Sequence, residues 1–149
     1  MAKSLRVLLF AASAVVVGAT LLAPQPAEAQ SKKAINPPGS PTNLPFSNGI
    51  VVGNTLYVAG TQGALSGDIK KETAGALENI RKIVEAAGFS MADVVAVNVY
   101  LADVKEFGAM NEVYRQVMPD PKPTRTTVGV AQLIGNARIE ISAIAVKSR

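Results

Sequence analysis

The amino-acid sequence predicts one α+β domain, a mixed β-sheet with two helices on one face in the order β-β-α-β-α-β-β. Short runs rich in β-branched and small apolar residues, bounded by glycine, asparagine and proline, are typical of strands. Two longer segments repeat apolar residues at spacings of three and four, which indicates amphipathic helices. Strands and helices in this order pack as a two-layer sandwich.

The first 29 residues have the order of a secretory signal peptide. Lys3 and Arg6 form a basic start, residues 7–23 are almost wholly apolar, and the A-E-A triplet at 27–29 fits a cleavage site. The apolar run is at the short limit for spanning a bilayer, so cleavage is favoured over an uncleaved anchor. We therefore expect Gln30 to be the first mature residue. The protein should be periplasmic or secreted, with no membrane attachment after cleavage.

The composition limits the chemistry that this chain can perform. The sequence contains no histidine and no cysteine, which excludes Ser-His-Asp and Cys-His catalysis, disulfides and ordinary zinc sites. The glycines between residues 60 and 67 match neither phosphate-loop pattern. We therefore expect no metal and no cofactor.

The positive charge of the chain belongs to its ends. Removing residues 1–29 from the 149 leaves 120 residues, enough for one domain with a core. The net charge of the whole chain is +4, but between residues 36 and 146 there are nine basic and ten acidic residues. The domain is therefore near neutral, and a nucleic-acid-binding face is not indicated.

The mature chain is expected to begin with a flexible linker over residues 30–44, because proline, glycine, serine and asparagine interrupt regular structure there. The domain is expected over residues 45–149. Its first two strands, residues 50–52 and 56–58, should form a hairpin around the Gly-Asn pair at 53–54.

The first helix is predicted from about residues 68–71 to Ala87, and Gly88 suits the left-handed conformation that ends many helices. Its apolar face is formed by Ile69, Thr73, Leu77, Ile80, Val84 and Ala87. A β-branched run over residues 94–101 then predicts a central strand.

The second helix is predicted to begin at a D-x-x-E pattern, Asp103 to Glu106, and to end at the proline-rich run 119–123. One side of this helix is expected to comprise Phe107, Met110, Tyr114, Val117 and Met118. The chain then forms two strands, joined by a Gly-Asn turn region, within residues 123–146.

Two charged residues lie in the apolar surroundings of these last strands. Arg125 begins the first strand and Glu140 lies inside the second. Charges are rarely buried without a partner or a task. The planar fork of an arginine is suited to hold a carboxylate and stays protonated at any working pH. From these residues alone, however, a structural ion pair at a subunit contact is the favoured explanation.

The predicted central and last strands, residues 94–101 and 137–146, carry apolar side chains on both faces. Two helices can cover only one face of a sheet, so the second face requires another partner. We therefore expect the protein to associate with further copies of itself.

Five motifs accompany the 123–146 block in a specific order and spacing. They are L-P-F-S-N-G at 44–49, L-Y-V-A-G-T-Q-G at 56–63, A-L-E-N-I-R-K-I-V-E-A-A-G at 76–88, V-Y-L-A-D at 99–103 and N-x-x-Y at 111–114. Together with the block, these motifs resemble the reactive intermediate deaminases, the RidA/YjgF group. The resemblance extends from about residue 43 to residue 146, nearly the whole mature chain, and would make this protein an exported member.

The resemblance implies a chorismate-mutase-like sandwich that assembles as a homotrimer with a site at each subunit contact. In that family, the arginine matching Arg125 holds the substrate carboxylate and the glutamate matching Glu140 lies near the hydrolytic water. Thr127, Phe46 and Asn111 fall at positions near the substrate. The implied reaction is hydrolysis of 2-imino acids, such as 2-iminopropanoate (formed from the enamine 2-aminoacrylate) and 2-iminobutanoate, to 2-ketoacids and ammonia.

The chain departs from the family pattern at three positions. Phe46 replaces a common tyrosine, Ala59 a common serine, and Thr127 a frequent cysteine. These changes bear on substrate range and rate more than on the reaction itself. The alternative function is a non-catalytic periplasmic trimer that binds small carboxylates or acts like a chaperone. An RNA-directed activity is disfavoured by the near-neutral domain.

The exported protein should begin at Gln30, because the small residues at 27 and 29 fit the cleavage site. Intact-mass analysis of exported protein tests this expectation. The variant Ala29→Arg, which removes a small residue from the site, should keep the leader. A parent protein that retains residues 1–29 would contradict the prediction.

Overall fold

The computed structural model describes residues 31–148, so the predicted signal peptide and the expected cleavage point lie outside the described residues. The elements are, in chain order, β1 (Lys32–Ile35), β2 (Gly49–Val52), β3 (Thr55–Thr61), α1 (Ile69–Ala86), η1 (Met91–Asp93), β4 (Val94–Leu101), η2 (Val104–Glu106), α2 (Phe107–Val117), β5 (Thr124–Gly129), η3 (Ile134–Asn136) and β6 (Ile139–Val146). The predicted α+β class is confirmed.

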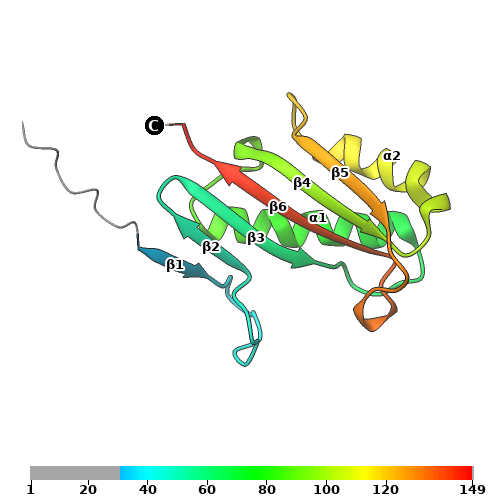
Figure 1. The fold of residues 1–149 in the computed structure, drawn as a ribbon, viewed down its shortest axis with the longest axis horizontal. Helices are drawn as coiled ribbons and strands as arrows, with labels where there is room; N and C mark the ends of the chain where they lie inside the picture. Colours follow the sequence, from blue (N-terminus) through cyan, green and yellow to red (C-terminus); the bar gives the residue numbers. More distant parts are fainter. Residues whose placement is uncertain (1–30, 149) are drawn as a thin grey trace, which may run out of the picture.

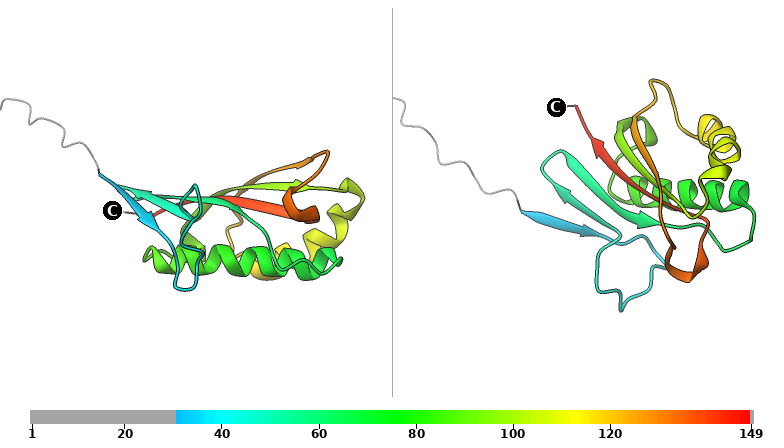
Figure 2. Two further views of the ribbon diagram at one scale, coloured as in Figure 1. Left: turned by 90° about the horizontal axis from the view of Figure 1, so that it is seen from below. Right: turned by 45° about the vertical axis from the view of Figure 1, so that its right-hand side comes forward.

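The six strands form one sheet in the order β1-β2-β3-β6-β4-β5, and both helices cover the same face (Figures 1 and 2). β4 and β5 are parallel, and the other pairs are antiparallel, so the predicted mixed sheet is also confirmed. The last two strands are consecutive in the chain, but β4 lies between them. The turn region at residues 134–136 therefore leads across a strand and does not close a hairpin.

The prediction of a flexible linker over residues 30–44 is wrong for residues 32–35. Residues 32–35 form strand β1, which pairs antiparallel with β2 from Lys32 opposite Val52 to Ile35 opposite Gly49. The edge of β2 offers unpaired backbone groups, and a neighbouring segment can satisfy them whatever its own strand propensity. The sheet therefore begins thirteen residues before the predicted domain start at residue 45.

Helix α1 agrees closely with its prediction. Asp68 caps its N-terminus by accepting hydrogen bonds from the backbone N–H groups of Lys70 and Lys71, at 2.8 and 3.3 Å. The predicted apolar face is buried from Ile69 to Val84. Gly88 adopts a φ of +79°, the left-handed conformation that the sequence predicted after the helix.

Helix α2 begins later than predicted. Asp103 caps the short turn η2 by accepting from the Lys105 N–H at 2.9 Å, and α2 starts at Phe107. The carboxylate of Glu106 does not close the predicted D-x-x-E box, because it pairs with Arg138. Met110 and Tyr114 are buried as expected, whereas Phe107 is exposed.

The second face of the sheet is open and partly apolar in the described chain. Strand register places Tyr57 beside Ile144, and Tyr100 between Val128 and Glu140, on this face. Within the described residues, no helix is long and apolar enough to cross a membrane. The apolar open face is the feature from which the sequence predicted association with other copies.

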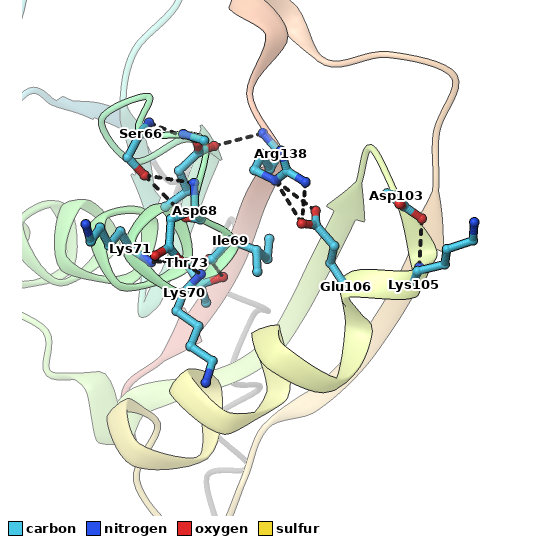
Figure 3. A network of polar contacts seen from close by, with 12 residues as sticks. Ser66, Asp68, Ile69, Lys70, Lys71, Thr73, Asp103, Lys105, Glu106 and Arg138 are labelled. Carbon is cyan, nitrogen blue, oxygen red and sulfur yellow. Dashed lines mark hydrogen bonds and ion pairs between the residues drawn. The ribbon is translucent and has the colours of Figure 1, made fainter.

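A buried carboxylate joins the start of α1 to the start of β6. Glu72 is 1% exposed and accepts backbone N–H bonds from Ser66 at 3.0 Å, Gly67 at 2.9 Å and Arg138 at 2.8 Å. The guanidinium of Arg138 pairs in turn with Glu106, with Nε 2.8 Å from Oε1 (Figure 3). Burial alone would raise the pKa of Glu72, but the three N–H donors and the Arg138 charge hold it below its ordinary value of 4.5.

Replacing Glu72 with glutamine should lower the free energy of unfolding at pH 7 by about 2–3 kcal/mol, because charge-assisted bonds to buried donors are lost. A lowered folded-state pKa stabilises the protein above pH 4.5 and loses that effect as pH falls through the folded value. The difference between parent and Glu72→Gln should therefore shrink in acid. Urea unfolding from pH 7 to pH 3 measures it.

Glu112→Gln is the matched control, because Glu112 is an exposed carboxylate paired with Lys70. Its stability should stay close to that of the parent at every pH. Equal losses in the two variants would show that the buried network around Glu72 is not the source of the effect.

Candidate active site

Arg125 lies on edge strand β5 and turns towards helix α2. Its guanidinium carbon lies 4.5 Å from the centre of the Tyr114 ring and 5.6 Å from that of Phe107, while Nη1 lies 3.9 Å from the sulfur of Met110. Among residues 31–148, no carboxylate forms an ion pair with Arg125. The guanidinium is therefore held by ring faces and a sulfur, and its charge is not neutralised.

The surface around this side chain forms a cleft of about 380 Å³, here called the Arg125 cleft. It is lined by Asn111, Tyr114, Arg115, Lys122, Pro123 and Arg125. The ammonium of Lys122 donates to the Met118 carbonyl at 2.6 Å, so the lining residues that carry a planar fork of donors are Arg125 and the exposed Arg115. Asn111, an expected substrate-binding residue, is thus placed beside Arg125.

Two hydroxyl groups near Arg125 are buried without a hydrogen-bond partner among the described residues. They belong to Tyr114 and to Thr127, which lies two positions further along β5. Burial raises the pKa of Tyr114, and the nearby Arg125 charge opposes part of that shift. Thr127, also an expected substrate-binding residue, therefore belongs to the Arg125 side of the molecule.

Glu140 lies in a different depression, an open hollow of about 480 Å³ called the Glu140 hollow. It is lined by Phe46, Ala59, Gly60, Gln62, Ile134 and Glu140. The amide of Gln62 donates to Oε2 of Glu140 at 2.9 Å and to the carbonyl of Ile134 at 3.2 Å. One carboxylate oxygen is thereby held, and Phe46, an expected substrate-binding residue, lines the same hollow as Glu140.

Gly60 makes room for this carboxylate. A Cβ atom placed on Gly60 would overlap Oε1 of Glu140 and would lie 2.9 Å from Cδ. Any side chain at position 60 would therefore displace the carboxylate from its present position. Gly60 lies near the end of β3 and Gln62 directly follows the strand, so one short segment supplies both groups that set the position of Glu140.

The two charged residues lie on opposite faces of the sheet. Arg125 pairs with Val97 on β4, and Val97 pairs with Ala143 on β6, so these three side chains share the face that carries the helices. Glu140 is three residues from Ala143, and successive side chains alternate, so Glu140 points to the open face. The described chain therefore does not bring Arg125 and Glu140 together.

The comparisons with known proteins agree with the fold and the motifs. The family model described as Endoribonuclease L-PSP matches residues 38–147. A 2-iminobutanoate/2-iminopropanoate deaminase of Dermatophagoides farinae is 39% identical over 77% of this chain and 96% of that protein. A RutC family protein of Pyrococcus horikoshii is 46% identical over 69% of this chain and 87% of its own.

Solved structures show the same relationship. The crystal structure of E. coli TdcF with bound serine has a TM-score of 0.73 and 32% identity, and covers 78% of this chain and 99% of TdcF. A Thermotoga maritima protein has a TM-score of 0.74 and 38% identity, and covers 78% of this chain and 98% of its own. The chain therefore belongs to the Endoribonuclease L-PSP family, the YjgF/RidA group that its motifs indicated.

Three residues of the site were missed from the sequence. Gln62 and Gly60 lie within the L-Y-V-A-G-T-Q-G motif, but no local pattern shows that they contact Glu140. Tyr114 was predicted only as part of one side of the second helix; it is buried there, and it also contacts Arg125. The N-x-x-Y motif was the available signal for this contact.

Replacing Tyr114 with phenylalanine should raise the free energy of unfolding by about 1 kcal/mol, because it removes a buried hydroxyl without a partner and keeps the ring. Tyr114→Leu, which removes the ring from Arg125, should lower it by about 2–3 kcal/mol. Urea unfolding of both variants gives the comparison. A loss of stability in Tyr114→Phe would show that the hydroxyl has a partner in the assembled protein.

Proposed function

We propose that this protein is a hydrolytic deaminase that converts 2-imino acids, such as 2-iminopropanoate and 2-iminobutanoate, to 2-ketoacids and ammonia. The proposal places the protein in an exported compartment, as the order of its first 29 residues suggests. The observation that carries it is the state of Arg125, a cation held by two rings and a sulfur with no carboxylate paired to it among residues 31–148.

An arginine held in this way is ready to bind a planar anion. Its fork can form two parallel hydrogen bonds to one carboxylate, which fixes the position and the plane of a small acid. The related TdcF has been crystallised with bound serine, an amino acid that carries such a carboxylate. These two observations support a 2-substituted carboxylic acid as the ligand of the Arg125 cleft.

The proposed active site is completed by a second copy of the chain. Arg125 and Glu140 point to opposite faces of one sheet, so one chain alone cannot place both on a small molecule. In the proposed homotrimer, the Arg125 cleft of one subunit faces the Glu140 hollow of the next. The same contact would cover the apolar open face, which includes Tyr57 and Val128.

The chemistry requires little beyond positioning and proton transfer. Arg125 holds the carboxylate, which places the adjacent imine carbon near Glu140. Water attacks this carbon while the carboxylate of Glu140 takes a proton from the water. In two successive transfers the same group gives this proton and then the hydroxyl proton of the tetrahedral intermediate to the nitrogen, the C–N bond breaks, and ammonia and the 2-ketoacid leave. Gln62 keeps Glu140 oriented throughout by holding Oε2.

Two substitutions should separate binding from turnover. Arg125→Lys keeps the charge but loses the planar fork, and should reduce kcat/KM about tenfold or more, the effect of about 1.5–3 kcal/mol in transition-state binding. Glu140→Gln keeps the shape and removes proton transfer, so it should lower kcat while ketoacid binding persists. Ketoacid release from enzymatically generated 2-iminopropanoate gives the rates, and calorimetry with pyruvate gives the affinities.

Mixing two inactive variants tests the divided site. In co-expressed trimers of Arg125→Ala and Glu140→Ala subunits, roughly a quarter of the subunit contacts should join an intact Arg125 to an intact Glu140. Activity should therefore return to a substantial fraction of the parent value. If both residues acted within one subunit, the mixture would stay inactive, and light scattering verifies that each preparation is trimeric.

Binding of pyruvate by the parent without any acceleration of imine hydrolysis would contradict the deaminase proposal. It would instead favour the alternative, a trimer that binds small carboxylates without turnover. Variants that dissociate into monomers would show that Arg125 and Glu140 serve the subunit contact.

A further inference from the structure

The Glu140 hollow is an unusually apolar place for a carboxylate. The polar side chains that line it are Glu140 and Gln62, and these are hydrogen-bonded to each other. The remaining wall consists of Phe46, Ala59, Gly60 and Ile134. Phe46 is 53% exposed and Ile134 is 84% exposed, so two large apolar side chains face the opening of the hollow.

Hydrogen bonds hold the backbone that carries these two side chains. Gln62 donates to the carbonyl of Ile134 as well as to Glu140, which links the turn at 134–136 to the carboxylate. The loop that carries Phe46 is held by Asn48, whose side chain donates to Ser40 at 3.0 Å and whose carbonyl accepts from the Ala59 N–H at 2.9 Å. Phe46 and Ile134 thus form a positioned wall beside Glu140.

We propose that this wall receives the side chain of the substrate, and that the protein favours 2-imino acids with branched or aromatic apolar side chains over 2-iminopropanoate. The inference rests on the proposed function. The imine carbon carries a carboxylate, a nitrogen and one further substituent. Arg125 holds the carboxylate, and Glu140 transfers protons from the water to the nitrogen. The third substituent then lies against the apolar part of the hollow, which measures about 480 Å³ in the single chain, before the neighbouring subunit closes it.

Phe46 and Ile134 offer a larger side chain an apolar surface. Each additional CH₂ group that is fully buried strengthens binding about threefold to fourfold. In a hollow that stays partly open, only part of this gain is obtained. The three additional carbons of a leucine-derived imine should therefore raise kcat/KM about tenfold over the alanine-derived imine. A polar side chain of similar size should gain less, because the amide N–H groups of Gln62 already donate to Glu140 and Ile134.

The experiment generates imines in place from L-alanine, L-leucine and L-phenylalanine with an L-amino-acid oxidase, and follows ketoacid release with and without the protein. The parent should favour the leucine- and phenylalanine-derived imines over the alanine-derived imine. Phe46→Tyr and Ile134→Ser each introduce a hydroxyl into the wall, and should reduce the leucine-to-alanine ratio to about threefold or less. Val104→Ala, an exposed apolar residue outside the hollow, should keep the parent ratio.

A second measurement does not depend on turnover. Calorimetry should show that 4-methyl-2-oxopentanoate binds the parent about tenfold more tightly than pyruvate, and that Phe46→Tyr and Ile134→Ser reduce this difference. Sedimentation verifies that the variants keep the assembly of the parent.

The outcomes separate this inference from the proposed function. Acceleration of every imine with no preference for the larger ones, and equal binding of the two ketoacids, would overturn the inference and leave the deaminase intact. No acceleration of any imine, with tight binding of the larger ketoacid, would overturn the deaminase and keep the apolar site. A parent preference that survives both wall substitutions would show that the side chain lies elsewhere and would also overturn the inference.

Discussion

The buried carboxylate of Glu72 is the interaction on which the arrangement of the Glu140 hollow depends. It holds the backbone at 66–67 and the backbone N–H of Arg138 against the first turn of α1. Gln62 lies just before the first of these segments, and Glu140 lies two residues after Arg138. One side chain thus joins the two segments that meet in the hollow. A carboxylate is suited to this role because its two oxygens can accept several N–H bonds at once.

Side chains alternate between the two faces of a β-strand, and this alternation places Arg125 and Glu140 on opposite faces of the sheet. Arg125 shares its face with the helices, and Glu140 shares its face with exposed apolar side chains. A single chain therefore presents an anion-binding cleft on one side and a carboxylate on the other. This division accounts for two otherwise separate features, an arginine with no acidic partner among residues 31–148 and an apolar sheet face with no cover from the described chain. Self-association would resolve both.

The environment of Arg125 differs from that of Arg138, which is also partly buried. Arg138 forms a close ion pair with Glu106, and its donors are used in joining structural elements. Arg125 rests against Tyr114 and Phe107, which attract the cation through their ring faces without occupying its hydrogen-bond donors. The structure thus separates a structural arginine from one whose donors remain available. An ion pair at a subunit contact, which the residues alone favoured for Arg125, stays a prediction, because the structure describes a single chain.

The sequence by itself determined the α+β class, both helices, five of the six strands and the family, because apolar periodicity, helix caps and motif order are local properties. It also identified Arg125 and Glu140, since charges in apolar strands are conspicuous. Only the tertiary structure decided that residues 32–35 pair with β2, because an edge strand accepts a partner through backbone groups that carry no sequence signature. The contacts of Gln62 and Gly60 with Glu140, and the placement of Glu140 opposite to Arg125, likewise depend on β4 lying between β5 and β6 and on β6 pairing with β3. Strand order is set by packing between distant segments, and no local pattern encodes it.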